Sequence, residues 1–207
     1  MKKFELTAEF VTNVFGKKLF RIKALVAFGN VEKGELGGFI EKEDNLSHDG
    51  NAWVYGNAQV YGNAWVSGDA RVYGNARVFG NAWVSGNAQV YGNAQVSGNA
   101  QVYGNAQVYG NAQVYGNAWV YGDAQVSGDA RVSGDADYAV VKGFGRCFRT
   151  TTFFRCKDKI LRVQCGCFYG DLAQFREIVK KTHGDSKYAK EYLSIADLME
   201  LHFSDEY

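Results

Sequence analysis

A six-residue repeat runs through the middle of the chain and constrains its fold more than any other feature. Between Asn51 and Ala136 the unit reads Gly-(Asn/Asp)-Ala-x-Val-(Tyr/Ser/Phe), and fourteen valines recur every six residues from Val54 to Val132. Because alternate side chains of a β-strand point to opposite sides, the Ala and Val of each unit share one side. Gly and Asn tolerate the positive φ of a tight corner. A short strand plus a corner, repeated in sixes, predicts a parallel β-solenoid.

The repeat resembles the hexapeptide repeat of left-handed β-helices, in which three hexads form one triangular coil of 18 residues. The likeness covers residues 51–136 and departs from the family in one respect, since Tyr or Ser mostly follows the aliphatic residue. It implies a mainly β fold, a left-handed parallel β-helix of about five coils. Members of this family are commonly trimers, so the resemblance also implies a homotrimer or a larger closed oligomer.

Residues 18 apart should stack on the same face, which turns the sequence into a map of the surface. The map places Trp53 in an outward-facing rank and gathers the other three tryptophans on one face, with tyrosines beside them. These aromatic side chains either form a self-stacking ladder or an interface between subunits. The resemblance to trimers favours assembly, and the predicted interface consists of Trp65, Trp83, Trp119, Tyr103 and Tyr121.

The segments on either side of the repeat are expected to cap the open coil ends, whose backbone groups would otherwise lack partners. Residues 1–50 predict an N-terminal β cap, with a hairpin formed by residues 10–15 and 19–24. Residues 137–207 predict a small α+β domain, with a β-hairpin (152–156 and 160–167) and two helices. The first helix begins at Asp171 with Gln174 in a capping box and ends at Gly184, and the second spans about 186–203.

Two further stretches resemble uncharacterised bacterial and phage proteins that carry this repeat. One is Leu36-Gly-Gly-Phe-Ile-Glu41 before the repeat, and the other comprises Cys165-Gly-Cys167 and Thr182-His-Gly-Asp185 after it. No established chemistry comes with this resemblance.

Charge and composition exclude several classes of partner. Twenty-three basic residues against 22 acidic ones give a net charge of +1, so no overall field attracts nucleic acid or a membrane surface. No apolar run is long enough to span a bilayer. Four cysteines are too few for a secreted disulfide scaffold. We expect a cytoplasmic protein of a bacterium or a phage-infected host.

Enzymatic and metal chemistry have little support in the residue pattern. Hexapeptide-repeat acyltransferases use acyl-coenzyme A and a histidine base, but no histidine lies between Asn51 and Ala136, and His48 precedes the coils. Zinc binding by Cys147, Cys156, Cys165 and Cys167 is an alternative, although their spacing is unlike paired Cys-x-x-Cys ligands. Cys165 and Cys167 are instead expected to point together into an apolar core. We predict no catalytic residue, metal or cofactor.

The strongest polar feature outside the repeat is a basic segment, residues 142–162, in which aromatic residues lie between basic ones. Its glycine-rich loop, Lys-Gly-Phe-Gly-Arg at 142–146, offers backbone amides to an anion, and its aromatic rings offer stacking to a base. The alternative is a solvated basic loop. The predicted ligand-binding residues are Lys142, Phe144, Arg146, Phe148, Arg149 and Arg155.

Together these observations predict a non-catalytic, homo-oligomeric binding protein, encoded by a phage, that sequesters an anionic or nucleotide-like ligand or a host protein. Two alternatives stay open. One is a divergent hexapeptide-repeat acyltransferase, and the other is a purely structural scaffold module.

Overall fold

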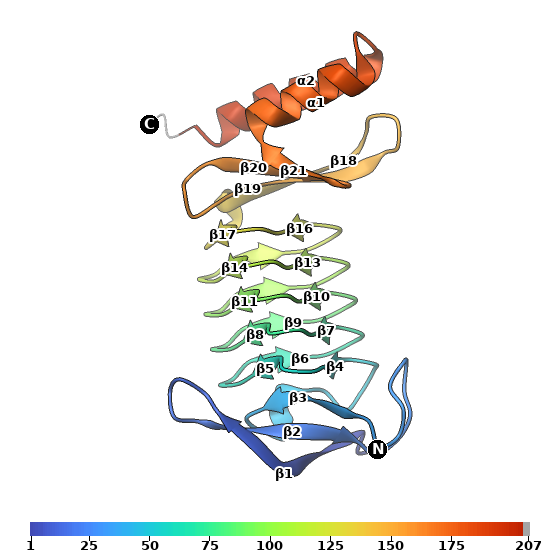
Figure 1. Cartoon of the computed structure of the whole chain (residues 1–207), viewed down its shortest axis with the longest axis vertical. Coiled ribbons are helices and arrows are strands. Elements are labelled where there is room, and N and C mark those ends of the chain that lie inside the picture. Colours follow the sequence, from blue (N-terminus) through green and yellow to red (C-terminus); the bar gives the residue numbers. More distant parts are fainter. Residues whose placement is uncertain (205–207) are drawn as a thin grey trace.

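The computed structural model describes residues 1–204 as a column of stacked coils with an antiparallel sheet at each end and two helices beyond the second sheet (Figure 1). The predicted fold class is confirmed: the protein is mainly β, with a solenoid of about five turns and a C-terminal sheet and helices that fit a cap. Neither helix in the described part of the chain is long and apolar enough to cross a bilayer.

Fourteen two-residue strands lie between Trp53 and Val132, one in every hexad. They are β4 (Trp53–Val54), β5 (Gln59–Val60), β6 (Trp65–Val66), β7 (Arg71–Val72), β8 (Arg77–Val78), β9 (Trp83–Val84), β10 (Gln89–Val90), β11 (Gln95–Val96), β12 (Gln101–Val102), β13 (Gln107–Val108), β14 (Gln113–Val114), β15 (Trp119–Val120), β16 (Gln125–Val126) and β17 (Arg131–Val132). Every third strand joins the same parallel sheet, so the coils have three faces.

The register of these sheets is 18 residues, as the resemblance to hexapeptide-repeat proteins implies. Val90 of β10 pairs with Val72 of β7 on one side and with Val108 of β13 on the other. The alanines from Ala52 to Ala130 and the valines from Val54 to Val132 are buried along the axis of the column. A continuous core of small, uniform side chains therefore lets every coil have the same cross-section.

Glycine at the corners allows the coils to stack closely. Gly98 has a φ of +69°, and a Cβ at this position would lie 2.9 Å from the backbone nitrogen of Gly116 in the next coil. The neighbouring Asn side chains form ladders along the corners. Asn81 Nδ2 donates to Asn99 Oδ1 at 3.0 Å, and Asn99 Nδ2 donates to Asn117 Oδ1 at 3.0 Å. These amides satisfy one another from coil to coil.

The N-terminal segment forms an antiparallel sheet that continues one face of the solenoid. It contains β1 (Phe4–Thr12), β2 (Lys18–Ala24) and β3 (Leu36–Ile40), followed by the short helix η1 (Glu43–Asn45). Strand β3 pairs in parallel with β5 of the first coil, so the edge of the solenoid at this face is covered.

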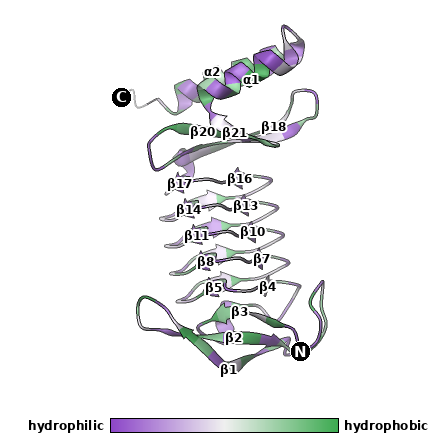
Figure 2. Ribbon diagram, viewed as in Figure 1, coloured by the Kyte–Doolittle hydropathy of each residue, from purple (hydrophilic) through white to green (hydrophobic). Residues whose placement is uncertain are grey.

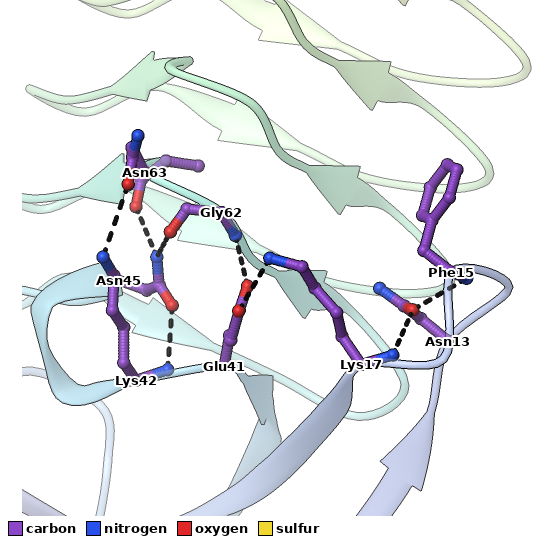
Figure 3. Close-up of polar contacts among 9 residues, drawn as sticks. Asn13, Phe15, Lys17, Glu41, Lys42, Asn45, Gly62 and Asn63 are labelled. Atoms are coloured by element: carbon purple, nitrogen blue, oxygen red, sulfur yellow. Dashed lines mark hydrogen bonds and ion pairs between the residues drawn. The ribbon is translucent and has the colours of Figure 1, made fainter.

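Polar side chains of this cap satisfy backbone groups of the first coil (Figure 3). The Asn45 amide donates to the carbonyls of Gly62 at 3.1 Å and Ala64 at 2.8 Å. The Glu41 carboxylate accepts from the Gly62 amide at 2.6 Å and from Lys17 Nζ at 2.8 Å. The cap therefore supplies the hydrogen bonds that a preceding coil would make.

Trp53 is a correction to the sequence map, because it is fully buried instead of facing outward. Phe28 lies edge-on against its indole at 5.3 Å between ring centroids, and Phe4 at 6.2 Å. The hexad pattern places Trp53 on the outer side of its strand correctly, but it carries no information on the N-terminal chain that folds over this end.

The C-terminal segment begins with the short helix η2 (Asp135–Asp137) and forms a four-stranded antiparallel sheet followed by two helices. The strands are β18 (Tyr138–Phe144), β19 (Arg149–Arg155), β20 (Leu161–Cys165) and β21 (Phe168–Asp171), and the helices are α1 (Leu172–His183) and α2 (Lys187–His202). The predicted hairpin is the central pair, β19 and β20. The flanking strands were missed because β18 lacks regular alternation and β21 is only four residues long.

The predicted capping box is present. The Asp171 carboxylate accepts from the Gln174 amide at 2.8 Å, and the Gln174 side chain accepts from the Asp171 amide at 3.0 Å. Ser186, which was predicted only as the approximate start of the second helix, caps α2. The sheet lies between the last coil and the helices. Phe154 packs on the solenoid core, whereas Phe153 packs on α1 and α2. Hydrophobic ribbon is visible in both end sheets, and hydrophobic and hydrophilic stretches alternate along the helices (Figure 2).

Replacing a corner glycine tests the stacking. Gly98→Ala should lose about 2 kcal/mol of unfolding free energy, because its positive φ is unfavourable for Ala and its Cβ meets backbone of the next coil. Gly56→Ala, with a φ of +59° but open space around it, should lose less, and Gly134→Ala, with a φ of −156°, should lose nothing. Urea unfolding measures all three. Equal losses would contradict this account of the corners.

Lys3 gives a prediction on pH. Its ammonium donates to the Ala52 carbonyl at 2.9 Å, and burial lowers its pKa from 10.5 to about 8, with Asp49 and Asp69 opposing the shift. Above pH 8 the unfolded chain binds more protons at Lys3 than the folded chain, so stability rises with pH, by at most about 1.4 kcal/mol per unit. Urea titrations between pH 8 and 9.5 should show this rise relative to Lys3→Met. Parallel curves for the two proteins would contradict it.

Candidate ligand-binding site

A cavity of about 350 Å³ lies between the C-terminal sheet and the two helices. We call it the helix–sheet cavity. Three parts of the chain form it: the β18–β19 turn, the β20–β21 turn and the inner faces of α1 and α2. Its lining residues are Arg146, Cys147, Arg149, Cys165, Cys167, Phe168, Phe175, Ile178, Val179, Thr182, His183 and Tyr192. The volume falls in the range of small-molecule sites.

Helix α2 holds the β18–β19 turn in place. The Gly145 amide donates to Glu191 Oε2 at 2.8 Å, and the Tyr192 hydroxyl donates to the Phe144 carbonyl at 3.4 Å. Gly145 has a φ of +71°, and a Cβ there would collide with the Tyr192 hydroxyl. The glycine therefore lets the turn pack directly on α2, which positions Arg146 and Arg149 at the cavity.

The cavity has cationic side chains and an apolar wall. Arg149 extends across the β20–β21 turn, where a Cβ on Gly166 would lie 2.5 Å from its Nη1 atom. Among the described residues, none that lines the cavity is an Asp or a Glu. Phe168 and Phe175 pack together at 5.6 Å between ring centroids, so the charged rim borders an aromatic surface.

Tyr192 lies close both to the aromatic side chain of Phe175 and to the guanidinium of Arg149. Burial raises its pKa to about 12, the neighbouring thiols of Cys165 and Cys147 add to the rise, and Arg149 opposes it. The hydroxyl is therefore protonated at neutral pH and keeps its hydrogen for donation. His183 stacks on the Tyr192 ring at 5.9 Å between centroids, which brings the end of α1 to the same cavity.

The six predicted ligand-binding residues do not form one group. Arg146 and Arg149 line the helix–sheet cavity, and Phe148 is two-thirds exposed in the turn between them, with a φ of +50°. Phe144 borders a separate depression with α2 residues, among them Lys190 and Leu198.

Lys142 and Arg155 lie elsewhere. Lys142 forms an ion pair with Asp123 at the edge of the last coils. Arg155 is at the other end of β19, where its guanidinium donates to the Phe203 carbonyl at 2.9 Å and lies over the Phe203 ring. Arg149 and Arg155 are the first and last residues of the seven-residue strand β19, so one small ligand cannot touch both.

The cysteines differ from the expectation that Cys165 and Cys167 share a buried side. Cys165 is half-buried, but Cys167 is exposed, because Gly166 has a φ of +59° and turns the chain into β21. Cys147 is also exposed, whereas Cys156 is buried beside the Tyr169 hydroxyl at 4.0 Å. Within residues 1–204, no group of three or more His, Cys, Asp or Glu side chains is arranged to hold a metal ion.

His48 lies in the N-terminal cap. Its Nδ1 accepts from the Lys3 amide at 3.2 Å, its Nε2 lies 3.7 Å from Glu43 Oε2, and its ring stacks on Phe4 at 4.3 Å between centroids. Both ring nitrogens thus face groups of the cap itself.

The structure separates the outward aromatic residues into two kinds. Tyr73, Tyr91 and Tyr109 form a parallel stack, with ring centroids 4.7 and 4.9 Å apart. The Tyr73 and Tyr91 hydroxyls donate to glutamine side chains of the next coil, and burial raises the pKa of Tyr91 to about 12. The second kind are the predicted interface residues, which lie on or directly after the strands of the sheet β15-β12-β9-β6. They include more exposed side chains, since Trp83 is half exposed.

The repeat is similar to a known family. It matches the family model described as YdcK beta solenoid repeat at residues 58–72, 70–86, 88–104, 94–110, 100–114, 106–122 and 124–136. The chain is a β-solenoid repeat protein. No curated protein matches it. The helix–sheet cavity lies outside the matched residues, so the match assigns its side chains no role.

Sequence reasoning missed the helical half of the cavity. It predicted a helix that ends at Gly184 and a second helix over about 186–203, but it did not bring Thr182, His183 or Tyr192 to the basic loop. A signal was present in Gly143 and Gly145, since both adopt positive φ and shape the turn that meets α2. The partner of that turn is a tertiary contact that no local pattern indicates.

The thiols give a direct test of how the C-terminal sheet packs on the last coil. Cys147 and Cys167 should react fastest with iodoacetamide, whereas Cys156 should react slowly, because it is buried and burial raises its pKa. Peptide mass spectrometry after brief alkylation of the native protein measures all four sites. Alkylation of Cys156 as fast as Cys147 would contradict the described packing of the sheet on the last coil.

Proposed function

We propose that the protein is a non-catalytic, homo-oligomeric binding protein that holds an anionic, nucleotide-like ligand in the helix–sheet cavity. The observation that carries the proposal is that both Arg146 and Arg149 line a cavity whose described lining contains no acidic residue. Arginine recognises phosphate and carboxylate groups by paired hydrogen bonds. A ligand anion supplies the negative charge that the cavity itself lacks.

The apolar part of the cavity supports the nucleotide-like character. Phe168, Phe175 and Tyr192 provide aromatic surface next to the arginines. A ligand with a planar ring and an anionic group matches this combination, because rings stack on aromatic side chains while guanidinium groups hold the anion. The Tyr192 hydroxyl and Thr182 add neutral hydrogen-bonding groups.

The cellular setting is part of the same proposal. All four cysteines are free, which supports a reducing cytoplasm in a bacterium or a phage-infected cell. A phage origin and the left-handed sense of the coils come from the resemblance of the sequence to hexapeptide-repeat proteins. Sequestration of a signal requires a tight cavity and no general base.

Calorimetric titration tests the binding proposal. Nucleoside monophosphates should bind the wild-type protein, and Arg149→Gln or Arg146→Gln should weaken binding at least about tenfold, the usual loss for a hydrogen bond to a charged group. Arg131→Gln is the matched control, because it removes one arginine from a coil position that glutamine occupies in other hexads.

Two outcomes would contradict the proposal. One is equal binding of nucleoside monophosphates by the wild type and both cavity variants, and the other is no binding to the wild type. Acetyl-coenzyme A in the same series addresses the acyltransferase alternative. Binding of this ligand that is lost in His48→Ala but kept in Arg149→Gln would favour the enzyme.

A further inference from the structure

The three faces of the solenoid differ in how well their aromatic residues are covered. Among the aromatic residues of the repeat, Trp65, Trp83, Tyr115, Trp119 and Tyr121 are the most exposed, at 38%, 50%, 38%, 46% and 52%. All but Tyr115 lie on or directly after strands of the sheet β15-β12-β9-β6. The tyrosine ladder on another face is covered by its own stacking. One face alone therefore concentrates exposed large aromatic side chains.

We call this surface the Trp face and define it by the outward residues of its four strands. They are Trp65, Ser67, Trp83, Ser85, Gln101, Tyr103, Trp119 and Tyr121. None of them is charged. The other two faces carry arginine at the equivalent strand positions, Arg71 on one and Arg77 and Arg131 on the other. Covering these eight side chains therefore desolvates no charged group among them, although Asp123 and Lys142 border the face beside Tyr121. A neutral surface of this kind favours a protein interface.

The composition and area of the Trp face fit the centre of a protein–protein interface. Tryptophan and tyrosine are the residues that most often dominate binding energy at interface centres. The exposed parts of its four most exposed aromatics amount to about 400 Å², taking 150–250 Å² for each complete side chain. A stable interface buries about 800 Å² per partner, so these rings supply half of that area before the partly exposed Gln101, Tyr103 and Ser85 are added.

The symmetry that a closed assembly requires indicates that a second copy of the same face packs on the Trp face. A closed ring of three needs two different complementary surfaces on every subunit, whereas a two-fold pair needs one surface that matches itself. The Trp face is neutral and aromatic, so a second Trp face is complementary to it. The other two faces offer no comparable cluster, because Tyr115 is their one strongly exposed aromatic residue within the repeat.

We propose that two copies of this chain pair through their Trp faces as a two-fold dimer. The proposal rests on the homo-oligomeric part of the proposed function and not on its ligand. It names a dimer where the resemblance to hexapeptide-repeat proteins implied a trimer. The two helix–sheet cavities of such a dimer are formed within single chains, so each binds its ligand independently of the pairing.

Sedimentation velocity and light scattering over a concentration series test the dimer. The wild type should have twice the mass of one chain, and Trp83→Gln should raise the dissociation constant about thirtyfold, as expected for loss of a central aromatic contact. Glutamine is compatible with the fold there, because Gln101 occupies the same position in the next coil of the same sheet. Tyr115→Ser is the matched control, since Ser97 and Ser133 occupy its position in adjacent coils, and it should stay dimeric.

Several results would overturn the proposal. They are a wild-type protein with the mass of a single chain, a mass of three chains, or a Trp83→Gln protein that pairs as strongly as the wild type. Arg149→Gln separates this inference from the proposed ligand. A dimer that persists in Arg149→Gln while ligand binding is lost supports both proposals. A monomer that still binds the ligand overturns the dimer and the homo-oligomeric part of the proposed function, but it leaves the proposed ligand binding intact.

Discussion

The stacking of each coil on the next at every eighteenth residue is the interaction on which the rest of the structure depends. It requires the backbone to turn three times per coil without a protruding side chain, and glycines of positive φ such as Gly98 make this possible. Strand pairing such as Gln95 with Gln113 then follows in register, with backbone hydrogen bonds of 2.9 Å between coils. A column built in this way has a uniform core and three flat faces.

Because the coils are nearly identical inside, the side chains that could bind a ligand or a partner lie at the ends and on the outer faces of the column. At the first coil, Asn45 and Glu41 replace the hydrogen bonds of a missing coil. At the last coil, the C-terminal sheet does the same work, since Thr152 Oγ1 accepts from the Gln125 amide at 3.0 Å and Gln164 accepts from Ser127 at 3.1 Å. The second face of that sheet is then free to pack on α1 and α2, and the helix–sheet cavity forms where this packing is incomplete.

The sequence is most informative where structure is periodic. The regular valines and corner glycines of the hexad predict the solenoid. The resemblance to hexapeptide-repeat proteins implies its 18-residue coil, on which the grouping of Trp65, Trp83 and Trp119 depends. The first helix could be predicted too, because the Asp171 and Gln174 capping box and Gly184 are local signals for its start and end.

What could not be predicted depends on contacts between distant segments. The burial of Trp53 requires Phe4 and Phe28 to fold over it, and the exposure of Cys167 requires the turn at Gly166. For the same reason, only part of the candidate site could be predicted from the sequence. Arg146 and Arg149 form a visible basic cluster, but His183 and Tyr192 reach them only through the packing of the helices on the sheet.

Native mass spectrometry of the protein, purified gently from expressing cells, tests the central claim most directly, namely that this solenoid carries a small anion in a cavity at its C-terminal end. We expect paired chains that each retain one small anionic molecule, with the extra mass absent from Arg149→Gln prepared in the same way. Bare chains that also fail to take up added nucleoside monophosphate would contradict it.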